Sequence, residues 1–445
     1  MSLHEPARPA AGGRGAAPRV PHVVRRVAGG VGWRLMRVAR PRPALSGPVD
    51  TVACDVAVFF SDGYMRLYQI EQWLPVLERL GRQRPTVLVV RHQESYDELT
   101  QRTDLPAVLL PTFRDLSTFY HRADPKIALY VNNGNRNFQS LSYPRMLHVH
   151  INHGESDKVS MVSNQAKAYD RVFVAGEAAV HRHRAALMQF DESRLVPVGR
   201  PQLDLELEPA LPPSERATVL YAPTWEGEEE NNNYTSLDRY GREIARAALS
   251  LPNVRFVYKP HPRVETGTIP SVLAAHKAIV AAVREAAGRD PQAGHTVASR
   301  AVDVLALIRQ ADLLVSDVSS VALDFLYLRT GHPLVITDRR NDRSRLAVDA
   351  PVSQVCEVVD GSTVARVRAL LESQLAEDTH AADRERMRQF YFGDLQPGQS
   401  TERFLAAIDE LAVLRDSLIG APSSPASPAS PPSPAGTTGS AGTAG

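Results

Sequence analysis

The feature that most constrains the fold is an alternation between short apolar, β-branched runs and longer amphipathic stretches, which occurs twice along the chain. In the first set, strands are predicted at 51–60, 86–91, 127–131, 146–151 and 171–175, with a helix at 68–80. In the second set, strands are predicted at 218–222, 254–259, 312–316 and 333–337, with helices at 238–249, 301–309 and 321–328. Because strands that alternate with helices pair in parallel, we expect an α/β protein with helix-covered parallel sheets.

A proline-rich stretch separates the two sets and marks the expected domain boundary. Residues 196–215 read VPVGRPQLDLELEPALPPSE and have no helical period. We therefore expect one Rossmann-like domain at 49–205 and a second at 214–420, facing each other across a central cleft. Open α/β sheets bind ligands at the carboxyl ends of their strands, so functional residues should directly follow strands.

The two ends of the chain differ in composition from the middle. Residues 1–48 contain nine arginines and one acidic residue, Glu5, and apolar residues recur there every three or four positions. This pattern predicts either a basic amphipathic helix on an anionic membrane surface or an irregular basic segment, because several glycines weaken the helix. Residues 421–445 are Ala, Ser, Pro, Gly and Thr, a composition that predicts a disordered tail.

Charge, cysteine content and hydropathy narrow the function classes. The chain has 51 Lys and Arg against 50 Asp and Glu, which gives no support for nucleic-acid binding. Its two cysteines, Cys54 and Cys356, lie far apart within apolar runs, which favours a cytoplasmic protein without a disulfide framework. No apolar run reaches the roughly 18–20 residues that span a bilayer, so contact with the inner face of the membrane would be peripheral.

The first strand-end motif is His153-Gly154-Glu155-Ser156-Asp157-Lys158, which follows the run MLHVHIN. The imidazole of His153 could accept a proton from an attacking hydroxyl, and Lys158 could hold a phosphate. The alternative is an ordinary loop with a hydrogen-bonded histidine. His148 and His150 also permit a zinc site with His153, although the chain contains no Asp-x-Asp pair.

The second motif, Lys259-Pro260-His261-Pro262, follows the run NVRFVY. The two prolines restrict the backbone on both sides of His261. A fixed imidazole beside Lys259 suits a phosphate oxygen or a leaving group, and the alternative is a plain proline-rich turn.

The third motif, Ser316-Asp317-Val318-Ser319-Ser320, lies between the strand ADLLV and the helix VALDFLYL. The free N–H groups at a helix start attract anions, and serine hydroxyls add donors. The alternative is N-capping by serine, and both roles can hold at once.

The fourth motif, Tyr221-Ala222-Pro223-Thr224-Trp225, follows the run RATVL. It brings the hydroxyl of Thr224 to a strand end. Trp225 could line a pocket, but a core position is the better expectation for a single aromatic residue.

Together and in this order, the four motifs resemble those of the CDP-glycerol glycerophosphotransferase family, which includes teichoic acid primases and polymerases. That family carries H-G-T-x-x-K, Y-A-P-T-W, x-H-P and [ST]-D-x-S-S motifs, and a late Gly-x-x-[ST]-x-R run that resembles residues 398–403 here. The resemblance covers about residues 145–415. It implies a GT-B fold, a CDP-alcohol donor, a lipid-linked or polymeric acceptor, and chemistry without a metal or another cofactor.

The resemblance also implies roles for individual residues. By match, His153 and His261 are expected to be catalytic. Contacts to the donor phosphates or nucleotide are expected from Lys259, Ser316, Asp317, Ser319, Ser320 and Arg403, and further substrate contacts from Gly154, Lys158, Thr224 and Ser400. The first domain would then bind the acceptor and the second the nucleotide donor, with the last helix packing back on the first domain.

The chain departs from the family pattern after His153-Gly154. Glu155-Ser156-Asp157 stands where the family has Thr-Pro-Leu. Two added carboxylates beside the expected base could change the acceptor or the donor alcohol.

Other function classes fit some of the same sequence features. A GT-B glycosyltransferase that uses a nucleotide sugar would share the cleft and the helix-end phosphate site. A non-catalytic, membrane-associated scaffold would use the basic N-terminal segment and the Pro/Ser tail, and it would need no intact histidines. A metal-dependent hydrolase is disfavoured by the missing Asp-x-Asp pair.

Overall fold

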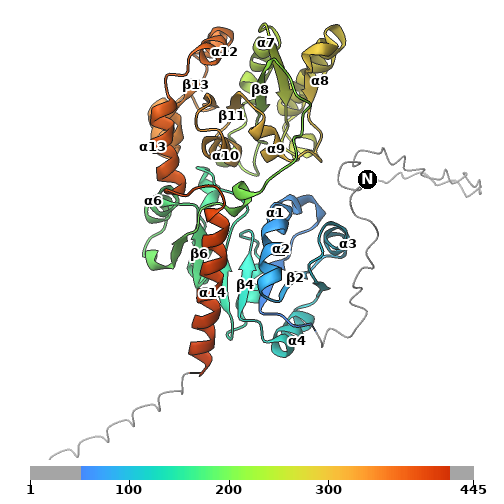
Figure 1. The fold of residues 1–445 in the computed structure, drawn as a ribbon, viewed down its shortest axis with the longest axis vertical. Helices are drawn as coiled ribbons and strands as arrows, with labels where there is room; N and C mark the ends of the chain where they lie inside the picture. Colours follow the sequence, from blue (N-terminus) through green and yellow to red (C-terminus); the bar gives the residue numbers. More distant parts are fainter. Residues whose placement is uncertain (1–51, 421–445) are drawn as a thin grey trace, which may run out of the picture. The chain divides into compact units, whose positions relative to one another are not determined.

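The computed structural model describes residues 52–420, and Figure 1 shows their two sheets with the helices around them. The basic segment at 1–48 and the tail at 421–445 lie outside the described residues. Within residues 52–420, no helix combines the length and the apolar character needed to cross a membrane.

The first sheet has seven parallel strands in the order β3-β2-β1-β4-β5-β6-β7. The strands are β1 (Val56–Phe60), β2 (Thr86–Val90), β3 (Ala107–Leu109), β4 (Ile127–Tyr130), β5 (Leu147–His150), β6 (Arg171–Val174) and β7 (Leu195–Pro197). The helices are α1 (Tyr68–Glu71), α2 (Leu74–Gln83), α3 (Gln93–Arg102), α4 (Phe113–Ala123), α5 (Asn137–Leu141) and α6 (Glu177–Ala186). Every residue of β1 and β2 is buried, as expected for central strands with both faces covered.

The second sheet repeats this topology with six parallel strands in the order β10-β9-β8-β11-β12-β13. The strands are β8 (Ala217–Ala222), β9 (Val254–Tyr258), β10 (Thr296–Val297), β11 (Leu313–Ser316), β12 (Leu334–Thr337) and β13 (Glu357–Val359). The helices are α7 (Arg242–Leu249), α8 (Pro270–Arg289), α9 (Val304–Arg309), α10 (Ser320–Leu328), α11 (Arg343–Asp349), α12 (Val367–Ala376), α13 (Ala381–Phe392) and α14 (Gln399–Gly420). The predicted α/β class with parallel sheets is confirmed.

Both sheets reverse their strand order at one point, between β1 and β4 in the first and between β8 and β11 in the second. In sheets of this type the loops that leave such a point diverge, and they leave a crevice at the carboxyl ends of the strands. The motif around Thr224 follows β8 and the motif around Ser319 follows β11, so both lie at the reversal point of the second sheet.

Two predicted helices differ in detail from the structure. The helix expected at 68–80 is two helices, α1 and α2, with Trp73 between them. Pro75 lies in the first turn of α2. A proline there breaks no hydrogen bond of α2, because the first N–H groups of a helix have no partner within it, but a proline cannot continue the preceding helix α1. The helix expected at 238–249 begins with a π-helical turn, Leu237–Gly241, before α7.

The last helix, α14, packs against the first sheet although it follows the second sheet in sequence (Figure 1). Its buried residues Phe404, Ile408 and Leu411 join the same apolar cluster as the strand β1. Asp204 fixes the start of this helix, since its carboxylate accepts the N–H groups of Gly398 at 2.8 Å and Thr401 at 2.7 Å. The chain therefore returns from the second sheet to the first at about residue 398.

Candidate functional site

The loop after β5 approaches the start of α10 closely. A Cβ atom added at Gly154 would lie 3.3 Å from the Cβ of Ser320 and 3.8 Å from the Arg200 guanidinium. Glycine at this position therefore lets the first motif, which follows a strand of the first sheet, lie directly against the third motif, which follows a strand of the second sheet. A buried ion pair between Arg200 and Asp324 of α10 holds the same junction.

The neutral ring of His153 has its proton on Nδ1. Its Nδ1 lies 3.3 Å from the carbonyl oxygen of Val131, and a carbonyl can only accept, so Nδ1–H donates. Burial lowers the pKa of His153 to about 4, although the bond to Val131 opposes that shift. At neutral pH the imidazole is uncharged, and its Nε2 carries a lone pair that can accept a proton.

The ring of His261 has the opposite arrangement. Its Nδ1 accepts the backbone N–H of Arg263 at 3.1 Å, so the proton of the neutral ring is on Nε2. Burial lowers the pKa of His261 well below its ordinary value, and the positive charge of Lys158 adds to this effect. His261 is therefore a neutral hydrogen-bond donor, whereas His153 is a neutral acceptor.

Tyr68 of α1 joins the two imidazoles, and it was not among the residues expected from the sequence. Its ring meets His153 edge-on at 6.1 Å and His261 edge-on at 5.8 Å between ring centroids. The sequence contained a signal for Tyr68 as a site residue, because Tyr68 lies in the segment that follows the first predicted strand, at 51–60. The structure thus brings the two expected catalytic histidines, one from each domain, around a single aromatic side chain.

Trp225 packs against the apolar core of the second sheet, as expected, but it also contacts His261. It is only partly buried, and its ring stacks on His261 at 6.2 Å between centroids. The guanidinium of Arg263 also lies over the Trp225 ring, 3.6 Å from its centroid. His261 therefore contacts two aromatic rings, Tyr68 and Trp225.

Lys158 connects the loop after β5 to the loop after β8. Its Nζ donates to the hydroxyl of Thr224 at 2.7 Å, and the N–H of Thr224 donates to the buried carboxylate of Asp317 at 2.7 Å. Burial lowers the pKa of Lys158 to about 8, and the negative charge of Asp317 limits that shift. The lysine is therefore mostly charged at neutral pH.

Lys259 is a second buried cation close to His261. Its Nζ donates to the carbonyl of Ser299 at 2.7 Å. Burial lowers its pKa to about 8, and Asp303 opposes the shift. Two lysines from different domains thus place positive charge near the two histidines.

The residues of the third motif divide into two groups. Ser316 and Asp317 are fully buried, and their polar atoms contact the protein: the Ser316 hydroxyl donates to the Ala222 carbonyl at 2.8 Å, and Asp317 accepts three hydrogen bonds. Ser319 occupies the N-cap of α10 but accepts no capping bond. The N–H groups at the start of α10, next to Ser320, are therefore not covered by the cap side chain.

Two expected residues lie apart from this cluster. Arg403 is exposed on α14 and forms no hydrogen bond or ion pair with any residue in the range 52–420. Ser400 is fully buried beside Gly199, where an added Cβ would lie 2.2 Å from the Ser400 hydroxyl. Ser400 therefore packs the start of α14 against the loop that contains Gly199.

The two carboxylates that depart from the family pattern have partners of their own. Both are buried and form ion pairs with Arg182 of α6, which lies 2.6 Å from Asp157. Tyr391 of α13 also donates to Asp157. Both carboxylates are thus held by a largely buried arginine, and Asp157 is also held by a tyrosine hydroxyl.

The two histidines of β5, His148 and His150, have separate surroundings. Both ring nitrogens of His148 contact protein oxygens, the Tyr130 hydroxyl at 2.8 Å and the Tyr143 carbonyl at 2.9 Å. His150 stacks on Tyr169 with 5.0 Å between ring centroids. In the part of the chain that the structure describes, no group of three or more His, Cys, Asp or Glu side chains could hold a metal ion.

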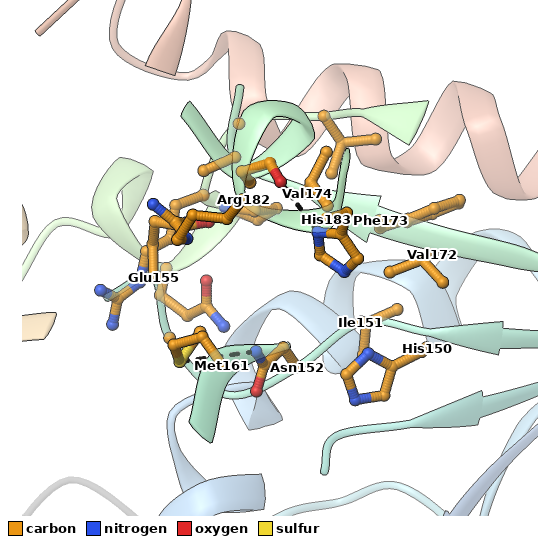
Figure 2. Close-up of a pocket in the computed structure, with 18 of the residues that line it drawn as sticks. His150, Ile151, Asn152, Glu155, Met161, Val172, Phe173, Val174, Arg182 and His183 are labelled. Carbon is orange, nitrogen blue, oxygen red and sulfur yellow. Dashed lines mark hydrogen bonds and ion pairs between the residues drawn. The ribbon is translucent and has the colours of Figure 1, made fainter. Parts of the chain in front are cut away.

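A pocket lies at the carboxyl ends of β5, β6 and β7. Figure 2 shows Arg182 and Glu155 at one end of this pocket and the rings of His150 and His183 at the other. Asn152 and Gly154, the neighbours of His153, form part of its wall.

The chain is similar to known proteins in both sequence and structure. The model of a family described as CDP-Glycerol:Poly(glycerophosphate) glycerophosphotransferase matches residues 152–408, which include all four motifs. No curated protein matches the chain.

Solved structures with a similar fold have little sequence identity to the chain. A protein from Listeria monocytogenes with the provisional name UDP-N-acetylglucosamine 2-epimerase is 13% identical with a TM-score of 0.53, over 80% of this chain and 96% of its own. The wall teichoic acid polymerase TagF is 13% identical with a TM-score of 0.52, over 85% and 93%. MnaA of S. aureus with UDP is 13% identical with a TM-score of 0.51, over 81% and 97%. These matches confirm the predicted GT-B type of fold.

Proposed function

Because the chain belongs to the CDP-glycerol:poly(glycerophosphate) glycerophosphotransferase family, we propose that it transfers glycerol phosphate from CDP-glycerol to a hydroxyl of a lipid-linked or polymeric acceptor. The observation that carries the proposal is the pair of complementary imidazoles: His153 offers a lone pair and His261 offers an N–H, and both rings contact Tyr68. An acid–base reaction between a hydroxyl and a diphosphate needs one group of each kind.

In the proposed reaction the acceptor oxygen attacks the β-phosphorus of CDP-glycerol. A new bond forms between that oxygen and phosphorus, the bond from phosphorus to the bridging oxygen breaks, and CMP leaves with that oxygen. Nε2 of His153 takes the proton of the attacking hydroxyl. Its low pKa makes the ring available as a base at neutral pH, although the same shift makes it a weak one.

Charge on the diphosphate would be balanced by fixed donors. We assign this role to Nε2–H of His261, to Lys158 and Lys259, and to the N–H groups at the start of α10. Groups that are already oriented stabilise developing charge without reorganisation, and phosphoryl transfer depends mainly on such positioning. Ser316 and Asp317 would act as positioning residues, since their polar atoms already bind the protein.

A donor screen tests this proposal. Full-length protein is incubated with an acceptor extract and with CDP-glycerol, CDP-ribitol or a UDP-sugar, and released CMP or UDP is measured. We expect CMP from CDP-glycerol. UDP release alone would instead identify a glycosyltransferase, and no nucleotide release in the presence of tight donor binding would favour a scaffold.

Two histidine variants test the assigned roles. We expect His153→Ala and His261→Ala each to lower kcat by about 10²–10³-fold, the usual cost of removing a general base or one fixed donor. His121→Ala is the matched control, because His121 is exposed on α4. Near-normal turnover of either site variant, with an unchanged circular dichroism spectrum, would reject its role.

A further inference from the structure

Three solvent-exposed charged side chains meet near the paired histidines. The guanidiniums of Arg66 and Arg263 both bind Oε1 of Glu228, at 3.0 and 3.2 Å. The side chains of Arg66, Arg263 and Glu228 are 43%, 26% and 59% exposed, so a solute can reach all three. Ion pairs that are this exposed contribute little to folding stability, and stability therefore does not account for the position of this cluster.

Both arginines are close to residues that contact the histidines. The backbone N–H of Arg263 donates to Nδ1 of His261, and its guanidinium lies over the ring of Trp225, which stacks on His261. Arg66 precedes Tyr68, whose ring contacts both imidazoles. Burial raises the pKa of Tyr68, and the positive charges of Arg263 and Arg66 oppose that shift. An anion bound to the two guanidiniums would therefore lie beside the reacting groups.

The charges of this cluster suit an anion with a single negative charge. Asp62 also pairs with Arg66, at 3.3 Å, and its other oxygen accepts the amide N–H of Asn132 at 2.7 Å. Of the two positive charges, Asp62 compensates one and Glu228 compensates the other. When Glu228 moves away, one positive charge is left, and a phosphodiester carries one negative charge at neutral pH.

A phosphodiester also matches the geometry of the two guanidiniums. In the structure both guanidiniums converge on one oxygen of Glu228. A phosphodiester has two unesterified oxygens, so each guanidinium can bind an oxygen of its own, and the planar fork of arginine favours such contacts. Glu228 follows β8 in a segment that is neither helix nor strand, so its side chain can leave without breaking secondary structure.

We propose that Arg66 and Arg263 bind one phosphodiester of the acceptor, and that Glu228 occupies their site until the acceptor displaces it. The family description names a poly(glycerophosphate), a polymer whose units are joined by phosphodiesters. That the phosphodiester belongs to the acceptor rests on the proposed function. The chemical class of the bound group does not, because it follows from the two guanidiniums and their compensating charges.

Arg66→Gln and Glu228→Gln test the site because their expected effects are opposite. Arg66→Gln removes one guanidinium and should raise the acceptor KM about 5- to 10-fold. Glu228→Gln removes the competing carboxylate and should lower the acceptor KM about 3-fold, and both variants should keep the KM for CDP-glycerol within about 2-fold of wild type. Arg79→Gln and Glu402→Gln are the matched controls, because Arg79 of α2 and Glu402 of α14 form an ion pair of similar exposure, 45% and 62%. Neither control should change either KM.

Direct binding separates this inference from the proposed function. In isothermal titration calorimetry with glycerophosphoglycerol, a phosphodiester without a nucleotide, Arg66→Gln should bind more weakly than wild type and Glu228→Gln more tightly, while Arg79→Gln matches wild type. That result supports the site even if no donor releases CMP. Equal binding by Arg66→Gln and Arg79→Gln, no binding by Glu228→Gln, or a change confined to the Kd of CDP-glycerol would overturn the inference. CMP release in the same preparations would leave the transfer reaction standing.

Discussion

The ion cluster of Glu155, Asp157 and Arg182 predicts a large and specific loss of stability when its cation is removed. The side chains are 7%, 2% and 17% exposed, respectively, so both carboxylates depend on Arg182 for compensation. Arg182→Met would leave two buried carboxylates with only the Tyr391 hydroxyl as a strong partner. Breaking a buried pair by removing one member costs about 3–5 kcal/mol, because an uncompensated charge remains.

The assay is unfolding in urea, monitored by circular dichroism. The slope of the free energy of unfolding against urea concentration shows whether both variants unfold in the same way. Arg184→Met is the matched control, since Arg184 lies on the same helix, α6, and pairs with Glu192 on the surface. That variant should differ little from wild type. The triple variant Glu155→Gln, Asp157→Asn, Arg182→Met should recover most of the loss, because no charge is left uncompensated.

The pH dependence of Arg182→Met provides an independent check. Burial already raises the pKa of Asp157 to about 7 in the wild type, although the hydrogen bond from Tyr391 opposes that shift. Loss of the positive charge of Arg182 should raise this pKa further above the unfolded value of about 4. The folded state then binds more protons than the unfolded state, so its stability falls as pH rises above about 4 and recovers as pH is lowered. The deficit relative to wild type should therefore shrink between pH 7 and pH 5. Equal stability of Arg182→Met and Arg184→Met at pH 7 would refute the reasoning.

Two further predictions concern the paired histidines. Burial holds the pKa of His153 at about 4 and the pKa values of Lys158 and Lys259 at about 8. We therefore expect kcat/KM to be constant from pH 5.5 to 7 and to fall above pH 8, where the lysines lose their charge. A fall in kcat/KM centred near pH 6.5, or constant activity through pH 9.5, would contradict this prediction. Tyr68→Ala should lower kcat about 10-fold or more, and it should move the acid limb of the pH profile of kcat/KM toward pH 6, because water then reaches His153. Tyr68→Phe keeps both ring contacts, so its kcat should stay within about 3-fold of wild type. Tyr64→Ala, a change at a more exposed tyrosine nearby, is the control, and an unshifted acid limb in Tyr68→Ala would remove the positioning role.

Some features of the fold could not be predicted from local sequence. The strands β3 and β7 have three residues each, too short for a periodic signal, and β7 ends at Pro197 inside the stretch taken as the domain boundary. The helix α8 was not predicted although a signal was available, because its buried residues Val272, Ala275, Ile279, Val283 and Ala286 recur every three or four positions. These elements form because neighbouring strands and helices cover them.

The class of fold and the order of the functional loops follow from the sequence alone. Alternating apolar runs require parallel strands covered by helices, and polar motifs directly after such runs must lie at one edge of each sheet. That reasoning is sufficient to single out His153, His261, Lys158 and Lys259. It does not say which side chains the two sheet edges bring into contact.

The chemical state of each group, in contrast, depends on tertiary contacts. Asp157 accepts a hydrogen bond from Tyr391, 234 positions later in the chain, and this contact holds its carboxylate in place. The proton positions on the two imidazoles depend on a carbonyl at Val131 and an N–H at Arg263, and no sequence pattern encodes those neighbours. Hydrogen bonding and burial act over a few ångströms in space, so they depend on how distant segments pack and not on their spacing along the chain.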